Sequence, residues 1–148
     1  MEATKTVAQV LRKKGHQVWS VEPDATMFDA LQKMADHDVG ALLVMDGNRL
    51  AGVISERDYA RKVILRGRAS KDTVVRDLMT SDVKTASPED TMQTCMERMT
   101  EHRIRHLPVV RDGTVIGMIS VGDVVEATIA EQAFLIEQLQ RYIQGGGM

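Results

Sequence analysis

The sequence has one cysteine, few aromatic residues and no long apolar run. The single thiol, Cys95, excludes an internal disulfide and fits a reducing compartment. Aromatic residues make up only 3% of the 148 residues, which argues against an aromatic cage. No stretch approaches the roughly 18 apolar residues of a membrane span, and the N-terminus lacks the apolar run of an export signal. We therefore expect a soluble, cytoplasmic protein without a membrane partner.

Excess charge and metal-ligand patterns are also missing. The chain has 19 basic and 21 acidic residues, so it offers no electrostatic footprint for nucleic acid. Four histidines and one cysteine show no metal-ligand spacing, and we expect no metal site. No phosphate-binding glycine loop and no catalytic triad signature is present. These absences argue against an enzyme and leave a binding module as the leading class.

What is present is an internal repeat: residues 18–64 align without a gap onto residues 83–129. Each matched pair has the same offset, since Asp123 minus Asp58 and Gly117 minus Gly52 are both 65. The identical pairs include Pro23/Pro88, Thr26/Thr91, Met27/Met92, Leu42/Leu107, Ile54/Ile119 and Ser55/Ser120. A duplicated half of this size predicts two similar units related by a pseudo-two-fold axis, with binding clefts where the halves meet.

Hydrophobic periodicity gives each repeat the same elements. A short apolar segment is followed by an amphipathic helix, whose apolar residues Met27, Ala30, Leu31 and Met34 correspond to Met92, Cys95, Met96 and Met99. Two short apolar runs joined by Asp46-Gly47-Asn48 or Asp112-Gly113 predict a β-hairpin. A second helix begins at Ser55 or Ser120. The repeat is therefore a β-α-β-β-α unit of an α/β (α+β) fold, and Cys95 on the core stripe predicts a buried, unreactive thiol.

The chain divides into five parts. We assign 1–17 to an N-terminal preamble helix, 18–65 to repeat 1, 66–82 to a linker with a second preamble helix, 83–129 to repeat 2, and 130–148 to a C-terminal helix with a glycine-rich tail. The two preambles share a Thr-Val start at Thr6 and Thr73. The basic stretch 66–72 reads as a solvated linker, with a ligand clamp as the alternative. The C-terminal helix packs either on its own domain or on a second subunit.

The sharpest local pattern is a serine at the end of a strand followed three residues later by an aspartate. It occurs as Ser55 with Asp58 and again as Ser120 with Asp123. One interpretation is a capping box, in which serine and aspartate satisfy the backbone N–H groups of a helix start. The other is a nucleotide site, because such N–H groups attract phosphate and a nearby carboxylate can accept hydrogen bonds from both ribose hydroxyls. Both interpretations remain open at this stage.

Together with the strand Leu107-Pro108-Val109-Val110 and the run Ile54-Ser55-Glu56-Arg57-Asp58, these motifs give the chain a family resemblance. It resembles a tandem pair of CBS domains, also called a Bateman module, of the small stand-alone bacterial type. The resemblance implies a homodimer and an adenosyl ligand: AMP first, with NAD(H), ADP or ATP as alternatives and S-adenosylmethionine also found in the family. It implies clefts shared between the repeats. One cleft would combine Ser55, Arg57 and Asp58 with Thr85, Ile104, Arg105, His106 and Pro108; the other would combine Ser120 and Asp123 with Ser20, Val39, Gly40 and Ala41.

The two predicted clefts differ in charge. Arg57 is matched by Gly122, Arg61 by Glu126, and repeat 2 carries Arg105 and His106 where repeat 1 has Gly40 and Ala41. We therefore expect the cleft built on Asp58 to be the more cationic one, suited to several phosphates or a dinucleotide. His37 and His102, near helix ends, are expected to be polar and solvent-facing.

Three functions follow, in order of preference. The first is a regulatory module that binds an adenine nucleotide, senses energy or redox state, and signals by a conformational or oligomeric change to a separate protein. The second is a structural adaptor whose clefts are empty and whose capping boxes are only caps. The third, an enzyme that uses a bound dinucleotide, ranks last because no base or proton donor specific to one half is found.

Overall fold

The computed structural model describes residues 5–143, which form two compact units. The first-repeat unit comprises residues 17–84. The second-repeat unit comprises residues 5–16 together with residues 85–143, so the N-terminal segment belongs to the repeat that is farther away in sequence. The glycine-rich tail expected at 145–147 lies outside the described residues.

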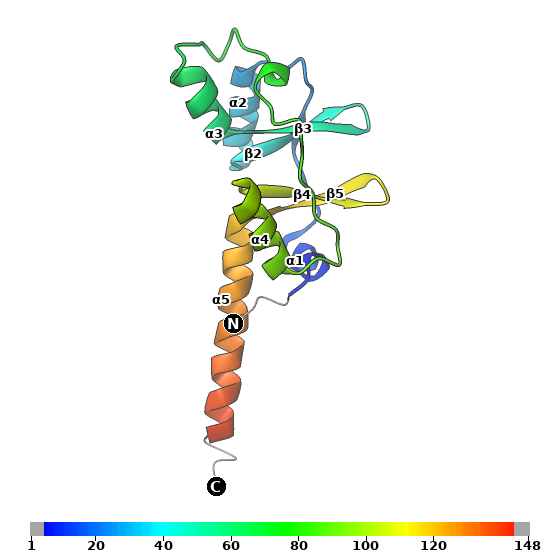
Figure 1. Ribbon diagram of the computed structural model, residues 1–148, viewed down its shortest axis with the longest axis vertical. Helices are drawn as coiled ribbons and strands as arrows, with labels where there is room; N and C mark the ends of the chain where they lie inside the picture. Colours follow the sequence, from blue (N-terminus) through cyan, green and yellow to red (C-terminus); the bar gives the residue numbers. More distant parts are fainter. Residues whose placement is uncertain (1–4, 144–148) are drawn as a thin grey trace. The chain divides into compact units, whose positions relative to one another are not determined.

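The first-repeat unit is a three-stranded sheet with helical segments around it (Figure 1). Its elements are β1 (Ser20–Val21), α2 (Met27–His37), β2 (Ala41–Asp46), β3 (Arg49–Ser55), α3 (Glu56–Tyr59), the π-helix η1 (Ala60–Ile64) and the single 3-10 turn η2 (Val75–Asp77). Strand β1 pairs parallel with β2, and β2 pairs antiparallel with β3. The hairpin turn has Gly47 at a positive φ of 63°, a conformation that glycine adopts without steric cost.

The second-repeat unit repeats this plan. It contains α1 (Val7–Lys14), α4 (Met92–His102), the hairpin β4 (His106–Arg111) and β5 (Thr114–Ser120), and α5 (Val121–Arg141). In place of β1 it has a single parallel bridge from Ala86 to Val109. Both hairpins carry a register shift at the equivalent place, after Val44 and after Val109. The expected β-α-β-β-α unit and the α/β fold class are confirmed.

Helix starts and ends follow local sequence signals. Thr26 caps α2 by accepting a hydrogen bond from the Asp29 N–H at 3.1 Å, and Thr91 caps α4 in the same way through Thr94. Both helices end on a residue in the left-handed region, Asp38 or Arg103. These caps fix where each hairpin begins, and therefore where its first residues lie.

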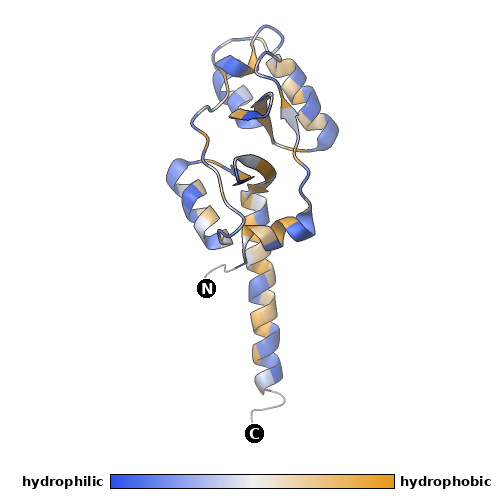
Figure 2. Ribbon diagram, turned by 90° about the vertical axis from the view of Figure 1, so that its right-hand side faces the viewer, coloured by the Kyte–Doolittle hydropathy of each residue, from blue (hydrophilic) through white to orange (hydrophobic). Residues whose placement is uncertain are grey.

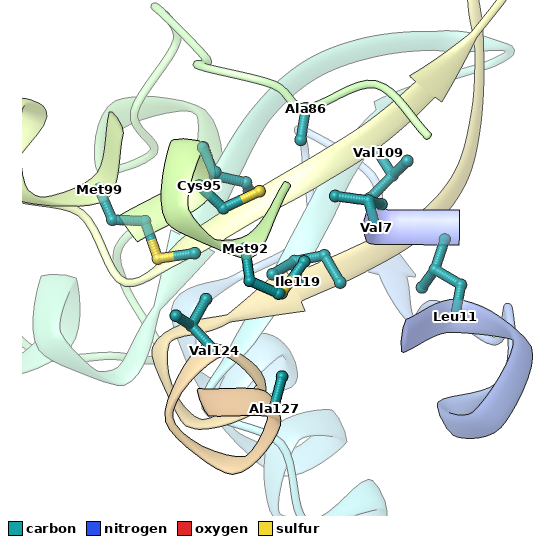
Figure 3. Packing of buried hydrophobic residues seen from close by; sticks show 11 residues of the cluster. Val7, Leu11, Ala86, Met92, Cys95, Met99, Val109, Ile119, Val124 and Ala127 are labelled. Carbon is teal, nitrogen blue, oxygen red and sulfur yellow. The ribbon is translucent and has the colours of Figure 1, made fainter. Parts of the chain in front are cut away.

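The preambles are exchanged between the repeats. Helix α1 precedes repeat 1 in sequence, yet its residues Val7 and Leu11 are buried in the core of the second-repeat unit. Side chains of α1, α4, the β4–β5 hairpin and α5 meet there (Figure 3). That cluster consists of Val7, Leu11, Ala86, Met92, Cys95, Met99, Leu107, Val109, Ile119, Val124 and Ala127. The preamble before repeat 2, with Val75 and Leu78, packs instead into the core of the first-repeat unit. This second preamble is only a 3-10 turn, shorter than the helix we expected.

The motif glycines lie where the preambles cross the sheets. A Cβ added at Gly117 would be 2.8 Å from both Leu11 Cδ atoms, and one at Gly52 would be 2.7 Å from Met79 Sδ and from the Thr80 carbonyl oxygen. Both distances are shorter than van der Waals contact. Each repeat therefore needs glycine at this position because the preamble packs directly against the strand backbone.

Helix α5 is one continuous helix, whereas the sequence pattern indicated a short helix at Ser120 followed by a separate C-terminal segment. It runs for 21 residues, and only Val124 and Ala127 in it are buried. Among residues 5–143, no helix combines the length and the apolar character needed to cross a membrane.

Candidate functional site

The Ser55–Asp58 motif forms a complete capping box at the start of α3. The Asp58 N–H donates to Ser55 Oγ at 3.2 Å. In return, Asp58 Oδ2 accepts from the Ser55 N–H at 2.9 Å and from its hydroxyl at 3.0 Å. The second carboxylate oxygen, Oδ1, forms an ion pair with Lys62 Nζ at 3.1 Å. The Asp58 side chain remains 15% exposed, so the carboxylate is held in place at the surface of its unit.

The same box recurs at the start of α5. The Ser120 N–H donates to Asp123 Oδ2 at 2.8 Å, and the Asp123 N–H donates to Ser120 Oγ at 3.2 Å. Lys14 Nζ lies 2.7 Å from Asp123 Oδ2. Asp123 is 16% exposed, nearly the same as Asp58. The capping-box interpretation is therefore confirmed in both repeats, and it leaves a fixed, partly exposed carboxylate at each helix start.

Sequence reasoning missed the two lysines that pair with these carboxylates. Lys62 is four residues after Asp58 on the same helical segment, a spacing that does signal an ion pair. Lys14 comes from α1, 109 residues away in sequence, and only the preamble exchange brings it there. Each lysine also donates to a backbone carbonyl, that of Leu78 at 2.8 Å or Met118 at 2.8 Å. The two repeats thus place one ammonium group beside each aspartate from non-equivalent positions.

The predicted strand residues lie beside the helix start in each unit. The Glu56 N–H donates to the Gly40 carbonyl at 3.1 Å, and Ala41 pairs with Ser55 across the hairpin. In the second-repeat unit the Val121 N–H donates to the Arg105 carbonyl at 3.0 Å, and His106 pairs with Ser120. One end of each hairpin therefore carries both an acidic motif and the strand residues that the resemblance assigned to the other cleft.

Ser20 and Thr85 occupy equivalent positions and are held by equivalent cations. Lys33 Nζ donates to the Ser20 carbonyl oxygen, and Arg98 Nη1 donates to the Thr85 carbonyl oxygen at 2.8 Å. Position 98 is position 33 plus the repeat offset of 65. Both basic residues lie on the amphipathic helix of their repeat. They are positioning residues that the sequence interpretation missed, because a basic residue on a helix surface reads as solvated.

Arg98 also forms an ion pair with Asp90, whose carboxylate accepts hydrogen bonds from both Arg98 and Ser87. Arg98 Nη1 lies 2.9 Å from Asp90 Oδ2, which also accepts from the Ser87 N–H at 2.9 Å. Burial by itself would raise the pKa of Asp90, but the hydrogen bond from Ser87 and the charge and hydrogen bond of Arg98 outweigh it and lower the pKa below its usual value. This network fixes the segment that carries Thr85.

Most of the remaining predicted residues make their hydrogen bonds through backbone groups. Val39 and Ile104 follow the left-handed caps, and their N–H groups donate to Met34 and Met99 at 3.0 Å. Pro108 is buried on β4, and its carbonyl accepts from the Ala86 N–H at 2.9 Å. Arg57 is half-buried, and Arg105 is exposed.

The charge distribution differs from the expectation in two respects. Burial lowers the pKa of His106, and the neighbouring Lys14 and Arg105 lower it further, although Asp123 opposes them. His106 therefore holds a proton less readily than a free histidine and contributes less positive charge than its residue type suggests. Beside Asp123, in contrast, α1, the segment before it and α5 line an open pocket of about 240 Å³ with three lysines in its wall. The lining is Lys5, Val10, Lys13, Lys14, Asp123, Glu126, Ala127 and Ala130.

His37 is not simply solvent-facing as we expected. Its ring stacks on Trp19 with the ring centroids 3.5 Å apart and an interplanar angle of 11°. Both residues are half-buried, and Trp19 packs against the first-repeat core. The matching residues in repeat 2, Lys84 and His102, make no such ring contact within the described chain.

Comparison with known proteins gives a consistent result. The model of the CBS domain family matches twice, over residues 7–65 and 75–130. The CBS domain-containing protein CBSX3, mitochondrial, of Arabidopsis thaliana is 44% identical over 95% of this chain and 73% of its own length. A solved protein with CBS domains from Burkholderia ambifaria, whose description proposes a role in signal transduction, is 46% identical with a TM-score of 0.83, covering 86% of this chain and 96% of that one.

A more distant structure shares the fold. A CBS domain pair crystallised with 5′-methylthioadenosine and S-adenosyl-L-methionine is 20% identical and has a TM-score of 0.75, covering 86% of this chain and 98% of that chain. The matches cover both repeats in the order in which the sequence repeats them. The chain belongs to the CBS domain family and is a tandem CBS pair, a regulatory and signal-transduction type of module.

Proposed function

We propose that this CBS pair binds an adenine nucleotide, AMP first and NAD(H), ADP or ATP as alternatives, and that occupancy regulates a separate protein. The observation that carries the proposal is the duplicated capping box. Each repeat holds a partly exposed aspartate at a helix start, beside the first residues of the hairpin and one lysine. A fixed carboxylate suits the two hydroxyls of a ribose, and an adjacent ammonium group suits a phosphate.

The residues of the proposed clefts remain those that the resemblance assigned, with two additions. One cleft is proposed to use Ser55, Arg57 and Asp58 with residues from 85 to 108, and the other Ser120 and Asp123 with residues from 20 to 41. We add Lys62 to the first and Lys14 to the second, since each already touches the ribose-binding carboxylate. The adenosyl ligands of the distant CBS pair with the same fold support an adenosyl group over other nucleosides.

Titration calorimetry with AMP, ADP, ATP, NAD, NADH and S-adenosylmethionine tests this proposal. Asp58→Ala and Asp123→Ala are expected to weaken binding at one cleft each. The matched control is Thr91→Ala, which removes a helix cap outside both proposed clefts. All three variants should lose about 1 kcal/mol of stability, because Thr91→Ala removes an N-cap and each aspartate variant removes the reciprocal half of a capping box. Only the two aspartate variants should bind the ligand more weakly, each at its own cleft.

A structural adaptor without a ligand is the second candidate, and the completed capping boxes favour it. In that case both aspartates would serve only the helix starts, and the three variants would behave alike. A nucleotide at about a hundred times its dissociation constant adds roughly 2.7 kcal/mol to the free energy of unfolding. A thermal shift of that size in wild type supports the sensor, and its absence for every adenosyl compound supports the adaptor.

We also propose that the module works as a homodimer and is not an enzyme. The proposed output is a change in the geometry or assembly of the dimer, which a partner protein reads. Mass measurement by light scattering, with and without nucleotide, tests the dimer. Turnover of NADH by the purified protein would contradict the non-enzymatic assignment.

A further inference from the structure

The distal half of α5 has no core to pack against. The two buried residues of the helix, Val124 and Ala127, lie in its first two turns, and every residue from 132 to 143 is exposed. Figure 1 shows this half running beyond α1 and α4 of its own unit. An isolated helix of about 12 residues is marginal in water, and no residue between 5 and 143 packs on this segment to stabilise it further.

The exposed half is also strongly apolar. Its large side chains are Ile129, Phe134, Leu135, Ile136, Leu139, Tyr142 and Ile143, with exposed fractions from 43% to 70%. Figure 2 shows apolar and polar residues alternating along the helix. Several large apolar side chains exposed on one helix mark an interaction site on a protein surface.

Four of these seven residues, Ile129, Ile136, Leu139 and Ile143, lie on one stripe of the helix, and their spacing indicates the kind of partner. Residues 125, 129, 132, 136, 139 and 143 follow one another in steps of four, three, four, three and four, which is the heptad spacing of a coiled coil. The a positions are Ile129, Ile136 and Ile143, and the d positions are Val125, Gln132 and Leu139. β-Branched residues at a favour two parallel strands when leucine fills d, which Leu139 does in the distal heptad. The polar Gln132 at the preceding d position disfavours any register that would bury it against an apolar residue.

The flanking positions permit an identical helix as the partner. The residues at e and g between 128 and 142 carry no charge; they are Thr128, Ala133, Leu135, Gln140 and Tyr142. Two copies therefore meet without like-charge repulsion along the seam. The charged residues lie outside it, where Arg141 forms an ion pair with Glu137 at 2.6 Å within one helix.

We propose that the distal half of α5 forms a parallel two-stranded coiled coil with the same segment of a second copy of this chain. Residues 129–143 supply the seam, and Gln132 meets Gln132 of the second copy. This contact is separate from the proposed nucleotide clefts, since none of their residues lies beyond 123. It gives the proposed homodimer a defined contact and a defined orientation of the two chains.

Cysteine cross-linking in the full chain tests the proposal. Gln132→Cys places a thiol at a d position, and the matched control Gln138→Cys makes the same change at a c position on the outer face. The native Cys95 is buried and does not compete. Under mild oxidation at micromolar protein, Gln132→Cys should convert largely to a covalent dimer, and Gln138→Cys at least ten times more slowly. Equal cross-linking of the two variants, or none in either, overturns the proposal.

A second pair of changes checks the seam itself. In the Gln132→Cys background, Ile136→Asp places a charge at an a position and should abolish the cross-link. Phe134→Asp, also an exposed apolar residue but on the outer face, should leave it intact. A cross-link that survives Ile136→Asp contradicts the heptad. Nucleotide binding is measured separately by calorimetry, so the two proposals can fail independently. If the cross-link does not form but a nucleotide binds, only the coiled coil is wrong. If the dimer cross-links but binds no nucleotide, only the ligand proposal is wrong.

Discussion

At the residue scale, Asp58 and Asp123 each perform a structural task that sequence reasoning set against a functional one. Each carboxylate closes a capping box and pairs with a lysine while keeping about one-sixth of its surface exposed. A cap and a ribose site are therefore compatible in the same residue. If the proposed nucleotide binds there, its ribose hydroxyl would share each carboxylate with the ammonium group of Lys62 or Lys14, and that ammonium group would be available to a phosphate.

His106 makes stability depend on pH. Burial lowers the pKa of its folded form below the unfolded value of 6.5, so the unfolded chain binds the proton more readily. The contribution of His106 to the free energy of unfolding is fully present above pH 6.5. It decreases as the pH drops from 6.5 toward the folded pKa, with a slope of at most about 1.4 kcal/mol per pH unit. His106→Gln should flatten the decline between pH 7.5 and 5.5 in urea unfolding. The exposed His102→Gln is the control, and equal curves for both variants would refute the assignment.

Cys95 is expected to be chemically inert in the folded protein. Burial, reinforced by the nearby Asp90, raises the pKa of the thiol to about 11. Since the thiolate is the reactive form, a thiol reagent at pH 7.5 should modify native protein far more slowly than protein in denaturant. Rapid labelling of the native protein would show that the α4 core opens readily.

At the element scale, the strand glycines and the preambles depend on one another. Gly117→Ala would push a Cβ to within 2.8 Å of Leu11, and such overpacking costs about 1–3 kcal/mol. Gly122→Ala is the matched control, because its added Cβ meets nothing closer than Ser120 Oγ at 3.5 Å. That variant lies in the first turn of α5 and should be neutral or stabilising by up to about 1 kcal/mol. Chemical denaturation measures both, and equal effects would contradict the close approach of α1 to β5.

The sequence predicted those elements well whose structure depends on residues close together in the chain. The helix stripe around Met27, the hairpin turn at Gly47 and the serine caps depend on residues within one element or its neighbour. The 3-10 turn at Val75 was read as a helix because its Thr-Val start copies that of α1. The lysine at position 14 was missed because no local pattern places it beside a residue more than a hundred positions away.

At the scale of the whole molecule, the exchange of preambles links each repeat to the segment that precedes the other. Leu11 is 1% exposed in the second-repeat core, and Leu78 is 2% exposed in the first-repeat core. Such a leucine-to-alanine change costs about 2–5 kcal/mol. The sequence repeat predicted two units with a preamble before each, but no local pattern shows that each preamble packs into the core of the other repeat.

Amide hydrogen exchange can show which unit is destabilised by Leu11→Ala and which by Leu78→Ala. Leu11→Ala should speed exchange in α4 and the β4–β5 hairpin, although residue 11 is closer in sequence to repeat 1. Leu78→Ala should act instead on α2 and the β2–β3 hairpin. If Leu11→Ala loosened the first-repeat unit more than the second, the exchange of preambles would be wrong.

The most direct test of the central claim is calorimetric titration of wild type, Asp58→Ala, Asp123→Ala and Thr91→Ala with AMP. We predict binding to wild type and Thr91→Ala, with one cleft weakened in each aspartate variant. The same AMP affinity in all four proteins, or no binding of AMP or any other adenosyl compound to wild type, would contradict the assignment of these helix starts as nucleotide sites.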